Sequence, residues 1–417
     1  MLITTLTRIW LTKSIKPFMF KGEYDNQLDY ADCDSLGLYV HIPFCKQICS
    51  FCPYCKELYS KEKCDKYVDY LIREIHMVGS SYSSQKKVTS LYFGGGTPAL
   101  IADRLKEIIS VINQYFIITD GIGVELHPDN VSVDILQLLK DSGVTRISIG
   151  IQSFQEKFLS VLGRKNFDYT KIADALKKVE FETVSMDFIF ALPQQTVEDL
   201  KNDIETAFEN GANHIAIYPF IDFSFTKSTI NSMAKKEKRK LLDDITDYCM
   251  AKGYRRDSIW TFSNNCTAKY SSMTRDNFLG FGCSATTLLK SVFKINTFSV
   301  EEYENRIEND NLPTSLTLRF SLRQRMVYYL FWTLYSTKIN AKDFNSFFGK
   351  SLKKTYGLEF KIAEKLGYIV RKNDGYEMTL KGAFYYHYYE NFYTLSYIDK
   401  MWGIMKNEAF PSQMALK

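Results

Sequence analysis

Short β-rich apolar runs alternate with longer stretches of helical periodicity between residues 36 and 218. Six strands are expected in chain order, over Leu36–Ile42, Thr89–Phe93, Ile122–Leu126, Thr145–Gln152, Val184–Phe190 and His214–Tyr218. Amphipathic helices are expected between them, over Lys66–Met77, Asp103–Asn113 and Val197–Phe208. These strand–helix units predict an α/β fold with a parallel sheet and right-handed crossovers. The periodicity leaves open whether the sheet is doubly wound and open or a partial barrel.

The helix that follows Ile122–Leu126 is expected to begin at an Asn130 cap and to end at Gly143. Its apolar stripe is predicted to contain Leu138 and Leu139. Both end signals use residue types that commonly terminate helices.

Polar and glycine-rich residues recur where the predicted strands end. They are the cysteines after Ile42, the run Gly94–Pro98, the run Glu125–Pro128, Gln152, and Asp187 within its strand. Because parallel strands end at one edge of a sheet, α/β folds build their active sites there. We therefore expect these residues to lie close together.

The strand–helix rhythm is lost after Asn296, and we divide the chain into an N-terminal extension (1–35), a barrel (36–296) and a C-terminal domain (297–417). Residues 297–317 are expected to be a linker with one short helix. Helices over Ser321–Leu334 and Leu352–Leu366, a hairpin around Asn373–Gly375 and a final helix over Lys381–Met405 follow. This order resembles a winged-helix module.

Composition excludes few functions. The formal net charge of +5 on 417 residues, from 53 basic and 48 acidic side chains, is weak support for a nucleic-acid or membrane partner. Arg8 and Lys13 interrupt the apolar N-terminus, and no run reaches the length of a membrane span. Without an export signal, and with nine cysteines of which four are clustered, the thiols are expected to be reduced and metal-binding in the cytoplasm.

Four of the cysteines lie between Cys45 and Cys55, and the first three have the spacing CxxxCxxC. Three thiolates on one loop can bind three irons of a 4Fe–4S cluster and leave the fourth iron open to a ligand. A structural zinc site is the alternative, but it usually shows two separated CxxC pairs. The spacing therefore favours the cluster.

This stretch resembles the radical S-adenosylmethionine (SAM) superfamily, and the residues before it resemble the anaerobic coproporphyrinogen III dehydrogenase family within it. The motifs that carry the resemblance are YVHIPFC at Tyr39–Cys45, YFGGGTP at Tyr92–Pro98, ELHPDN at Glu125–Asn130, RISIGIQSF at Arg146–Phe154, LGRKN at Leu162–Asn166, MDFIFALPQQT at Met186–Thr196 and FLGFGCSA at Phe278–Ala285. They appear in the family's order and cover residues 36–290. The implied fold is a partial (β/α)6 radical SAM barrel followed by a winged-helix-like α+β domain.

The resemblance implies roles for individual residues. Cys45, Cys49 and Cys52 would ligate the 4Fe–4S cluster, whose open iron would be chelated by SAM. The residues expected to bind SAM are Tyr39, Phe51, Gly95, Gly96, Thr97, Glu125, Gln152, Arg164 and Asp187. Ordinary ion pairing is the competing reading of Arg164 and Asp187.

Tyr39, His41 and Cys55 are expected to act near the reacting atoms. The family uses the matching tyrosine and histidine near the SAM sulfonium, although a lone strand histidine is more often a core residue. In the coproporphyrinogen enzyme a fourth cysteine follows the last ligand by two residues, whereas Cys55 follows Cys52 by three. Cys55 would shuttle a hydrogen atom or proton, or else be a bystander or an alternative ligand. The remaining cysteines (Cys33, Cys64, Cys249, Cys266 and Cys283) are expected to be buried small hydrophobes.

The resemblance implies a radical SAM enzyme of tetrapyrrole metabolism that oxidatively decarboxylates propionates to vinyl groups. Arg255 and Arg256 are candidates to receive those propionates. A haem chaperone without decarboxylase activity and a radical methyltransferase of anaerobic haem breakdown are the alternatives. The expected partners are a porphyrinogen or haem and an electron donor such as flavodoxin or ferredoxin, with no nucleic acid.

Overall fold

The computed structural model describes residues 2–23, 26–228, 230–264 and 276–416. Its helices are Leu2–Thr12 (α1), Lys61–Gly79 (α2), Ala102–Tyr115 (α3), Val133–Asp141 (α4), Glu156–Val161 (α5), Tyr169–Lys178 (α6), Val197–Glu209 (α7), Lys235–Ala251 (α8), Val300–Glu308 (α9), Leu322–Tyr335 (α10), Ala341–Phe348 (α11), Leu352–Lys365 (α12), Leu380–Tyr393 (α13) and Asp399–Asn407 (α14). A π-helical turn over Thr394–Ile398 joins α13 to α14, so the expected final helix is one continuous rod.

The strands are Phe18–Lys21 (β1), Leu36–Ile42 (β2), Phe44–Cys45 (β3), Glu57–Leu58 (β4), Lys86–Val88 (β5), Leu91–Gly95 (β6), Phe116–Ile118 (β7), Ile122–Leu126 (β8), Arg146–Gln152 (β9), Thr183–Phe190 (β10), His214–Pro219 (β11), Arg255–Arg256 (β12), Thr261–Ser263 (β13), Asn277–Phe281 (β14), Thr286–Leu289 (β15), Val292–Asn296 (β16), Thr314–Arg319 (β17), Lys338–Asn340 (β18), Ile369–Lys372 (β19), Gly375–Met378 (β20) and Gln413–Leu416 (β21). The six strands expected from the sequence are therefore confirmed as β2, β6, β8, β9, β10 and β11.

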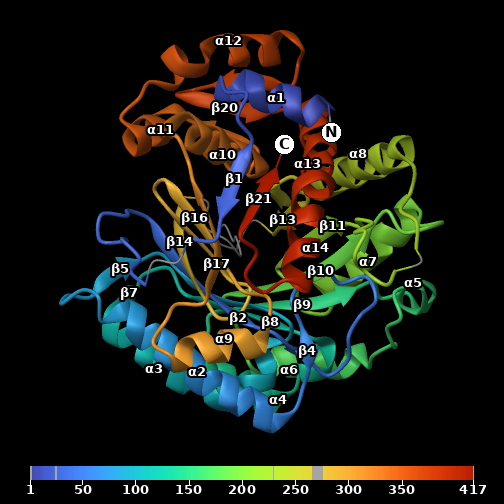
Figure 1. Ribbon diagram of the computed structural model, residues 1–417. Helices are drawn as coiled ribbons and strands as arrows, with labels where there is room; N and C mark the ends of the chain where they lie inside the picture. The colour runs from blue at the N-terminus through green and yellow to red at the C-terminus, as the bar shows by residue number, and fades with distance from the viewer. Residues whose placement is uncertain (1, 24–25, 229, 265–275, 417) are drawn as a thin grey trace.

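These six strands are parallel and hydrogen-bonded in the order β2-β6-β8-β9-β10-β11. Their side chains are buried on both faces, as the near-continuous apolar run of β2 shows, because helices cover one side and other elements fill the other. Figure 1 shows α2, α3, α4 and α6 side by side along the lower face of the sheet, and neighbouring members of this series contact each other. The strand ends are thus set into one rigid layer.

The amphipathic helix α2 shows how the sequence produces this packing. Ser60 caps it by accepting a hydrogen bond from the N–H of Lys63. Its buried residues Cys64, Tyr67, Val68, Leu71, Ile75 and Val78 recur at helical spacing on one face. The opposite face carries exposed charged side chains, so the helix has a single way to dock.

Two details of the expected helices are wrong. Helix α4 is capped by Ser132, whose hydroxyl accepts from the N–H of Ile135, whereas Asn130 lies in a preceding 3-10 turn. Leu138 is 44% exposed rather than part of the apolar stripe, because the buried face of the helix is formed by Leu136 and Leu139.

The main sheet continues beyond the six parallel strands. Strand β14 is parallel to β2, and β15, β16 and β17 then follow as antiparallel neighbours. The one short helix expected within residues 297–317 is present as α9, but the expectation of a linker is wrong at its end, where β17 begins at Thr314 and joins the main sheet. The division at residue 296 falls between β16 and β17, which pair with each other, and it stays a prediction.

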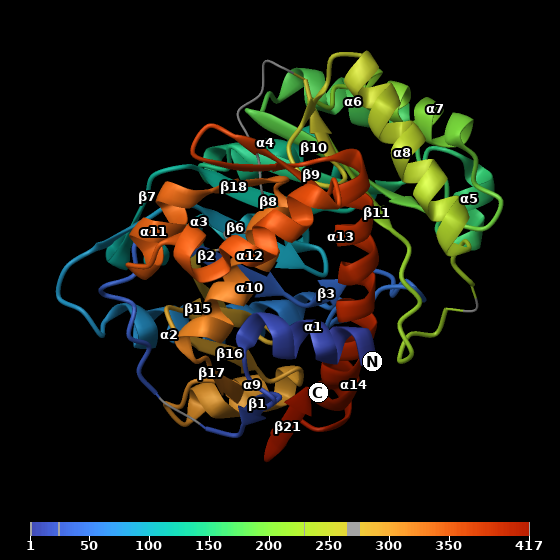
Figure 2. The same cartoon turned by 90° about the horizontal axis from the view of Figure 1, so that it is seen from above.

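The two ends of the chain meet on this sheet. β1 pairs with β17 on one side and with β21 on the other, and Figure 2 shows the N- and C-terminal segments side by side. Residues 18–21 are therefore built into the same sheet as residues 413–416.

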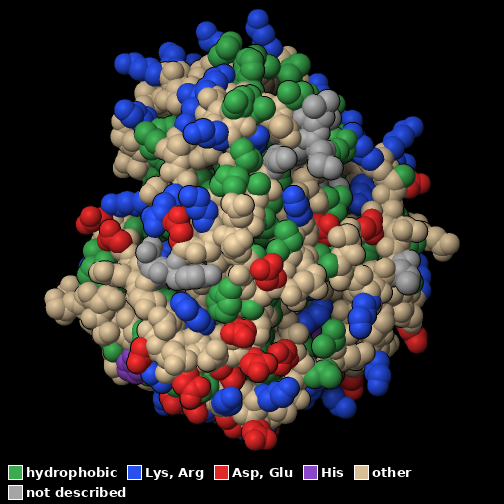
Figure 3. Space-filling model, in the orientation of Figure 1, with side chains coloured by type: hydrophobic (Ala, Val, Ile, Leu, Met, Phe, Trp, Pro, Cys, Tyr) green, Lys and Arg blue, Asp and Glu red, His purple; other side chains and the backbone are tan. Residues whose placement is uncertain are grey.

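A smaller unit is formed by α10–α12 and a three-stranded sheet in the order β18-β20-β19. The expected helices and hairpin of the winged-helix-like module are present as α10, α12 and β19–β20, whereas β18 and α11 were not expected. Figure 1 places this unit at the top of the molecule. On the face in Figure 3, Lys and Arg side chains gather over this module, whereas Asp and Glu gather at the opposite end over α9 and its neighbours. None of the helices in the described residues has the length and apolar character needed to cross a lipid bilayer.

Candidate active site at the strand ends

The loop that carries the cysteines is closed at its base. It leaves β2 at Ile42 and returns through β4, which pairs in parallel with β3 so that Phe44 faces Glu57 and Cys45 faces Leu58. The N–H of Tyr59 donates to the Cys45 carbonyl at 3.0 Å. The strand thus delivers the loop directly to the carboxyl edge of the sheet.

Cys45, Cys49 and Cys52 are free thiols, all partly exposed. The ammonium group of Lys56 donates to the carbonyls of Cys49, at 3.2 Å, and of Cys52, which ties the loop back on itself. The Thr97 hydroxyl lies 3.7 Å from the Cys45 sulfur, and burial raises the pKa of Cys45 to about 11. In the described residues no three His, Cys, Asp or Glu side chains converge closely enough to hold a single metal ion. The ligands of a 4Fe–4S cluster bind different irons and need no such convergence.

Tyr39 and His41 lie on β2 and form a line toward Cys55. The Tyr39 hydroxyl is 3.0 Å from Nδ1 of His41, and Nε2 of His41 is 3.2 Å from the carbonyl oxygen of Cys55. Burial lowers the pKa of His41 to about 4, so the imidazole is neutral at pH 7. A carbonyl can only accept, so Nε2 carries the proton and Nδ1 accepts from Tyr39.

Glu125 is held at the end of β8 by two donors on the neighbouring strand. The Tyr92 hydroxyl and the Gly95 N–H each donate to its carboxylate at 3.1 Å. Burial, followed by the charge of Asp187, raises the pKa of Glu125 to about 7. Glu125 is therefore present in both its protonated and its ionised form near neutral pH.

Asp187 on β10 accepts hydrogen bonds from the hydroxyls of Ser148, at 2.8 Å, and Ser185, at 3.0 Å. Burial raises its pKa to about 6 in spite of these two donors. In the strand registers Glu125 is opposite Ser148, and Ser148 is opposite Ser185. The two carboxylates therefore belong to one polar row across β8, β9 and β10.

The glycines after β6 allow close approach of the backbone. A Cβ atom at Gly95 would lie 2.5 Å from Cε1 of His41, and one at Gly96 would lie 2.6 Å from the carbonyl oxygen of Phe44. Gly95 also has a φ of +116°, which side chains disfavour. Gly95 and Gly96 consequently expose backbone groups to the site, whereas Thr97 turns its hydroxyl to the Cys45 sulfur.

Gln152, Arg164 and Phe51 flank this row. Gln152 ends β9 with a φ of +72°, a strained conformation for a residue with a side chain. Arg164 donates from Nη1 to the Gly150 carbonyl at 2.6 Å and lies 5.9 Å from the Phe51 ring centre. Among the described residues, Nε of Arg164 is buried without a hydrogen-bond partner. Arg164 is therefore not a simple ion-pairing residue.

The sequence reasoning missed a cover that comes from the far end of the chain. Trp402 of α14 lies 5.6 Å from the ring of Tyr54, between ring centres, and 6.2 Å from Phe223. About half of Tyr54 is exposed, but desolvation of its hydroxyl end, followed by the charges of Glu125, Cys52 and Asp187, raises its pKa, so this end of the side chain lies toward the polar row. The spacing CPYC was the sole local signal for Tyr54, and nothing local signals Trp402.

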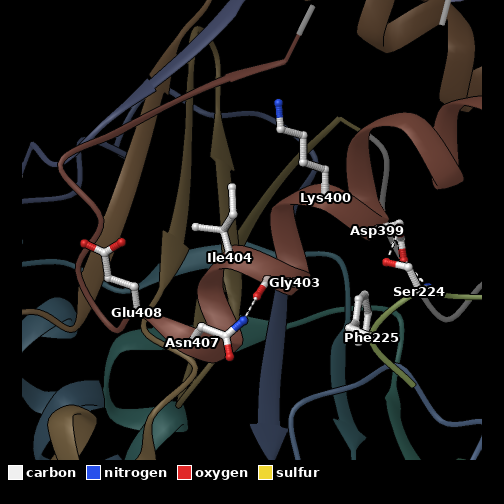
Figure 4. Close-up of a pocket in the computed structure, with 8 residues that line it drawn as sticks. All are labelled: Ser224, Phe225, Asp399, Lys400, Gly403, Ile404, Asn407 and Glu408. Carbon is white, nitrogen blue, oxygen red and sulfur yellow. Dashed lines mark hydrogen bonds between the residues drawn. The ribbon is translucent and has the colours of Figure 1, made fainter. Parts of the chain in front are cut away.

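A groove runs along the other side of α14 (Figure 4). There the Asp399 carboxylate accepts hydrogen bonds from the N–H and hydroxyl of Ser224, both at 2.7 Å. Its lining residues are Ser224, Phe225, Asp399, Lys400, Gly403, Ile404, Asn407 and Glu408. None of the residues expected for the site lines it, so this groove is separate from the strand ends.

Two further expectations concern the scattered cysteines and the arginines Arg255 and Arg256. Cys33, Cys64, Cys249 and Cys283 are buried as predicted, and Cys266 lies outside the described residues. Arg255 forms an ion pair with Asp257 at 2.7 Å, and Arg256 donates to the carbonyls of Ser258 and Ile259. Because Arg255 pairs in register with Ser263 opposite His214, at the start of β11, both arginines lie away from the carboxyl edge. They do not join the site.

Comparison with known proteins agrees with this geometry. Residues 39–207 match the radical SAM superfamily. The chain is 26% identical over 362 residues to the heme chaperone HemW of Bacillus subtilis, which covers 82% of this chain and 95% of that protein. It is 24% identical over 392 residues to the oxygen-independent coproporphyrinogen III oxidase of Synechocystis, covering 83% of this chain and 82% of that one.

The fold is that of a solved radical SAM enzyme. The structure of coproporphyrinogen III oxidase (HemN) from Escherichia coli superposes with a TM-score of 0.76 at 18% identity, covering 91% of this chain and 96% of that chain. The expected barrel fold is thereby confirmed. A radical SAM domain uses a 4Fe–4S cluster and SAM, and these are the cofactors of this chain. Residues 39–207 are therefore a radical SAM domain, in a chain related to oxygen-independent coproporphyrinogen III oxidases and to the heme chaperone HemW.

Proposed function

We propose that this chain is a radical SAM enzyme of tetrapyrrole metabolism that oxidatively decarboxylates propionate side chains to vinyl groups. The observation that carries the proposal is the meeting of two groups at one sheet edge. The free thiols of Cys45, Cys49 and Cys52 lie on the loop that follows β2. The carboxylates of Glu125 and Asp187 lie on β8 and β10 of the same sheet. This combination serves a cofactor with both a metal and a cationic organic part.

Cys45, Cys49 and Cys52 would hold the cluster, and the donor set fits it. All three thiols are free, partly exposed and on one short loop. The Thr97 hydroxyl contacts the Cys45 sulfur, and the Lys56 ammonium group binds a carbonyl of the loop rather than a sulfur. With one iron left open, bound cluster and SAM together supply a 5′-deoxyadenosyl radical.

SAM would lie over Gly95–Thr97, where a Cβ atom would collide with His41 or Phe44. Its amino group and ribose hydroxyls would donate to Glu125 and Asp187, which are acceptors when ionised. Arg164, with its unpartnered Nε, would meet the SAM carboxylate, and Gln152 would contact it beside Arg164. The Phe51 ring, packed partly against Phe158 and Leu162, would contact the adenine.

Tyr39, His41 and Cys55 would face the reacting atoms. His41 is neutral, and its Nε2–H donates a hydrogen bond to the Cys55 carbonyl. Its Nδ1 is therefore free to accept a hydrogen bond from the Tyr39 hydroxyl, which orients that hydroxyl. The charge of Glu125 raises the pKa of Tyr39 further, after burial, so Tyr39 stays protonated. It can therefore donate a hydrogen bond but not act as a base at neutral pH.

In the proposed reaction a hydrogen atom beside a propionate carboxylate would pass to the 5′-deoxyadenosyl radical. The substrate radical would then lose carbon dioxide and give one electron to an external acceptor, which leaves a vinyl group. A reduced flavodoxin or ferredoxin would supply the electron that initiates each turnover, and a cytoplasmic location suits such donors. Tyr54 and Trp402, which contact each other beside the polar row, would pack on the tetrapyrrole face.

One anaerobic experiment tests the proposal. The reconstituted chain would be mixed with SAM, a strong reductant and either coproporphyrinogen III or haem, and product masses recorded. Loss of two carbon dioxide units and four hydrogens is expected, together with 5′-deoxyadenosine. Cys45→Ala should lose both cluster iron and SAM cleavage, whereas the matched control Cys64→Ala should keep both. Retention of iron and SAM cleavage by Cys45→Ala would refute the assignment of the ligands.

A haem chaperone is the second candidate, and the relation to HemW over 95% of that protein's length favours it. The same mixtures distinguish it, because a chaperone would retain haem without consuming SAM. A gain of one methylene unit would instead indicate a methyltransferase.

A further inference from the structure

Two cysteines far apart in the sequence meet directly behind the cysteine loop. The sulfur of Cys55, at the end of the loop, lies 3.6 Å from the sulfur of Cys283, which follows β14. The two are 228 positions apart in the chain. Cys283 is fully buried, whereas 7% of Cys55 is exposed. No other sulfur–sulfur contact is found among the described cysteines.

The two thiols are anchored on adjacent backbone carbonyls. Cys55 donates to the carbonyl of Phe298 at 3.1 Å, and Cys283 donates to that of Thr297 at 3.2 Å. The carbonyls follow one another in the segment after β16, so they hold the sulfurs side by side. This arrangement brings two thiols into reach without any cofactor between them.

The backbone around Cys283 is fixed by α2. The Cys283 N–H donates to the Tyr67 hydroxyl at 2.9 Å, and that hydroxyl donates to the His41 carbonyl at 2.8 Å. The Gly282 N–H donates to the buried Glu74 carboxylate at 2.7 Å. The turn after β14 is thus held as firmly as the strand β2 that precedes the loop.

The two thiols differ in their electrostatics. The hydrogen bond from Cys283, together with the charge of Lys406 on α14, lowers the pKa of Cys55 against the effect of burial. Burial raises the pKa of Cys283 well above its ordinary value. Cys55 is therefore the more readily ionised and the more exposed of the two thiols, while Cys283 keeps its proton.

We propose that Cys55 and Cys283 form a dithiol site that is oxidised to a disulfide by hydrogen peroxide and restored by a thiol reductant. The Cys55 thiolate attacks one peroxide oxygen, the O–O bond breaks, and Cys55 becomes a sulfenic acid while hydroxide leaves and takes a proton to become water. The Cys283 sulfur then attacks the Cys55 sulfur, the S–O bond breaks, and a second water leaves with the Cys283 proton. Two thiols and one peroxide thus give one disulfide and two waters.

The disulfide would join the end of the cysteine loop to the turn between β14 and β15. A disulfide needs its sulfurs about 2.05 Å apart, so rotation of the two side chains closes most of the present separation. Peroxide suits the site because it is small and neutral, and little of Cys55 is exposed. The inference needs neither cluster nor SAM, and its test does not depend on the role that Cys55 has in the function proposed above.

The test treats the anaerobically purified full chain with hydrogen peroxide, quenches it in acid, alkylates free thiols and digests it with trypsin. The expected product links the peptide Gln47–Lys56 to the peptide Asp276–Lys290, two hydrogens lighter than their sum. Fragmentation on either side of Pro53 separates Cys55 from Cys49 and Cys52. The linked peptide should disappear after treatment with dithiothreitol.

The variants Cys55→Ser and Cys283→Ser should each abolish the linked peptide, whereas Cys64→Ser, at an equally buried position, should leave it unchanged. Far-ultraviolet circular dichroism of each variant verifies folding. Sulfinic acid at Cys55 with Cys283 still a free thiol would overturn the proposal. A disulfide from Cys55 to Cys49 or Cys52, or peroxide treatment that leaves both thiols free, would overturn it as well.

Discussion

The charge of Asp187 acts on Glu125 from across the strand between them, and it adds to burial in raising the pKa of Glu125 to about 7. The ordinary value is 4.5, so the folded chain holds a proton on Glu125 at pH values where the unfolded chain has released it. The contribution of Glu125 to the free energy of unfolding must therefore fall as pH rises from about 4.5 to 7, and it changes little above that window.

Glu125→Gln removes this contribution. We expect the difference in the free energy of unfolding, wild type minus variant, to decrease by on the order of 2 kcal/mol between pH 4.5 and 7. Urea unfolding of the cluster-free full chain at a series of pH values measures it. The exposed Glu180→Gln serves as the control. Parallel curves for wild type and Glu125→Gln would contradict the assignment.

Gly95→Ala tests the close packing beside His41. The new Cβ atom would lie 2.5 Å from Cε1 of His41, which is itself hydrogen-bonded at both nitrogens and cannot move freely. A destabilisation of about 2–3 kcal/mol is expected, with loss of SAM binding.

Gly163→Ala is the matched control for Gly95→Ala. Gly163 also has a positive φ, of +67°, but a Cβ atom there would meet nothing within 4 Å. Gly163→Ala should lower the free energy of unfolding by about 1 kcal/mol, from backbone strain alone. Equal costs at the two positions would show that the approach to His41 is unimportant.

Elements of this fold that are signalled by neighbouring residues were predicted from the sequence, whereas contacts between residues far apart in the chain were not. The six parallel strands were predicted because each is a short apolar run bounded by turn residues, and the order of their ends located the site. Strands β14–β17 were missed although consecutive strands among them pair with each other. The alternating Thr and Leu residues of β17 suggest one exposed face, whereas five of its six residues are buried. The support of Asp187 by Ser148 was missed because the two residues are 39 positions apart in the chain. No local pattern brings Cys283 to Cys55 or Trp402 to Tyr54.

Trp402→Ala tests whether α14 holds the cysteine loop. Trp402 is a partly buried ring that contacts Tyr54, Phe223 and Phe298, so its removal should destabilise the chain by about 2 kcal/mol. The amides of residues 46–56 should exchange hydrogen faster, as measured by mass spectrometry. Ile404→Ala, on the groove side of the same helix (Figure 4), should leave the exchange of that loop unchanged. Identical loop exchange in the two variants would mean that α14 does not cover the loop.

Tyr67→Phe tests the connection between β2 and the turn after β14. The Tyr67 hydroxyl is fully buried, accepts from the Cys283 N–H and donates to the His41 carbonyl, so its removal leaves two buried backbone groups unsatisfied. We expect a loss of about 2–4 kcal/mol in the free energy of unfolding. Tyr70→Phe, on the same helix but only partly buried, is the control and should cost less than about 1 kcal/mol. Because Tyr67 fixes the backbone of Cys283, the variant should also form the Cys55–Cys283 disulfide more slowly under the same peroxide exposure. A stable Tyr67→Phe variant with an unchanged rate of disulfide formation would show that other hydrogen bonds position the turn, such as those of Gly282 with Glu74 and Asn296.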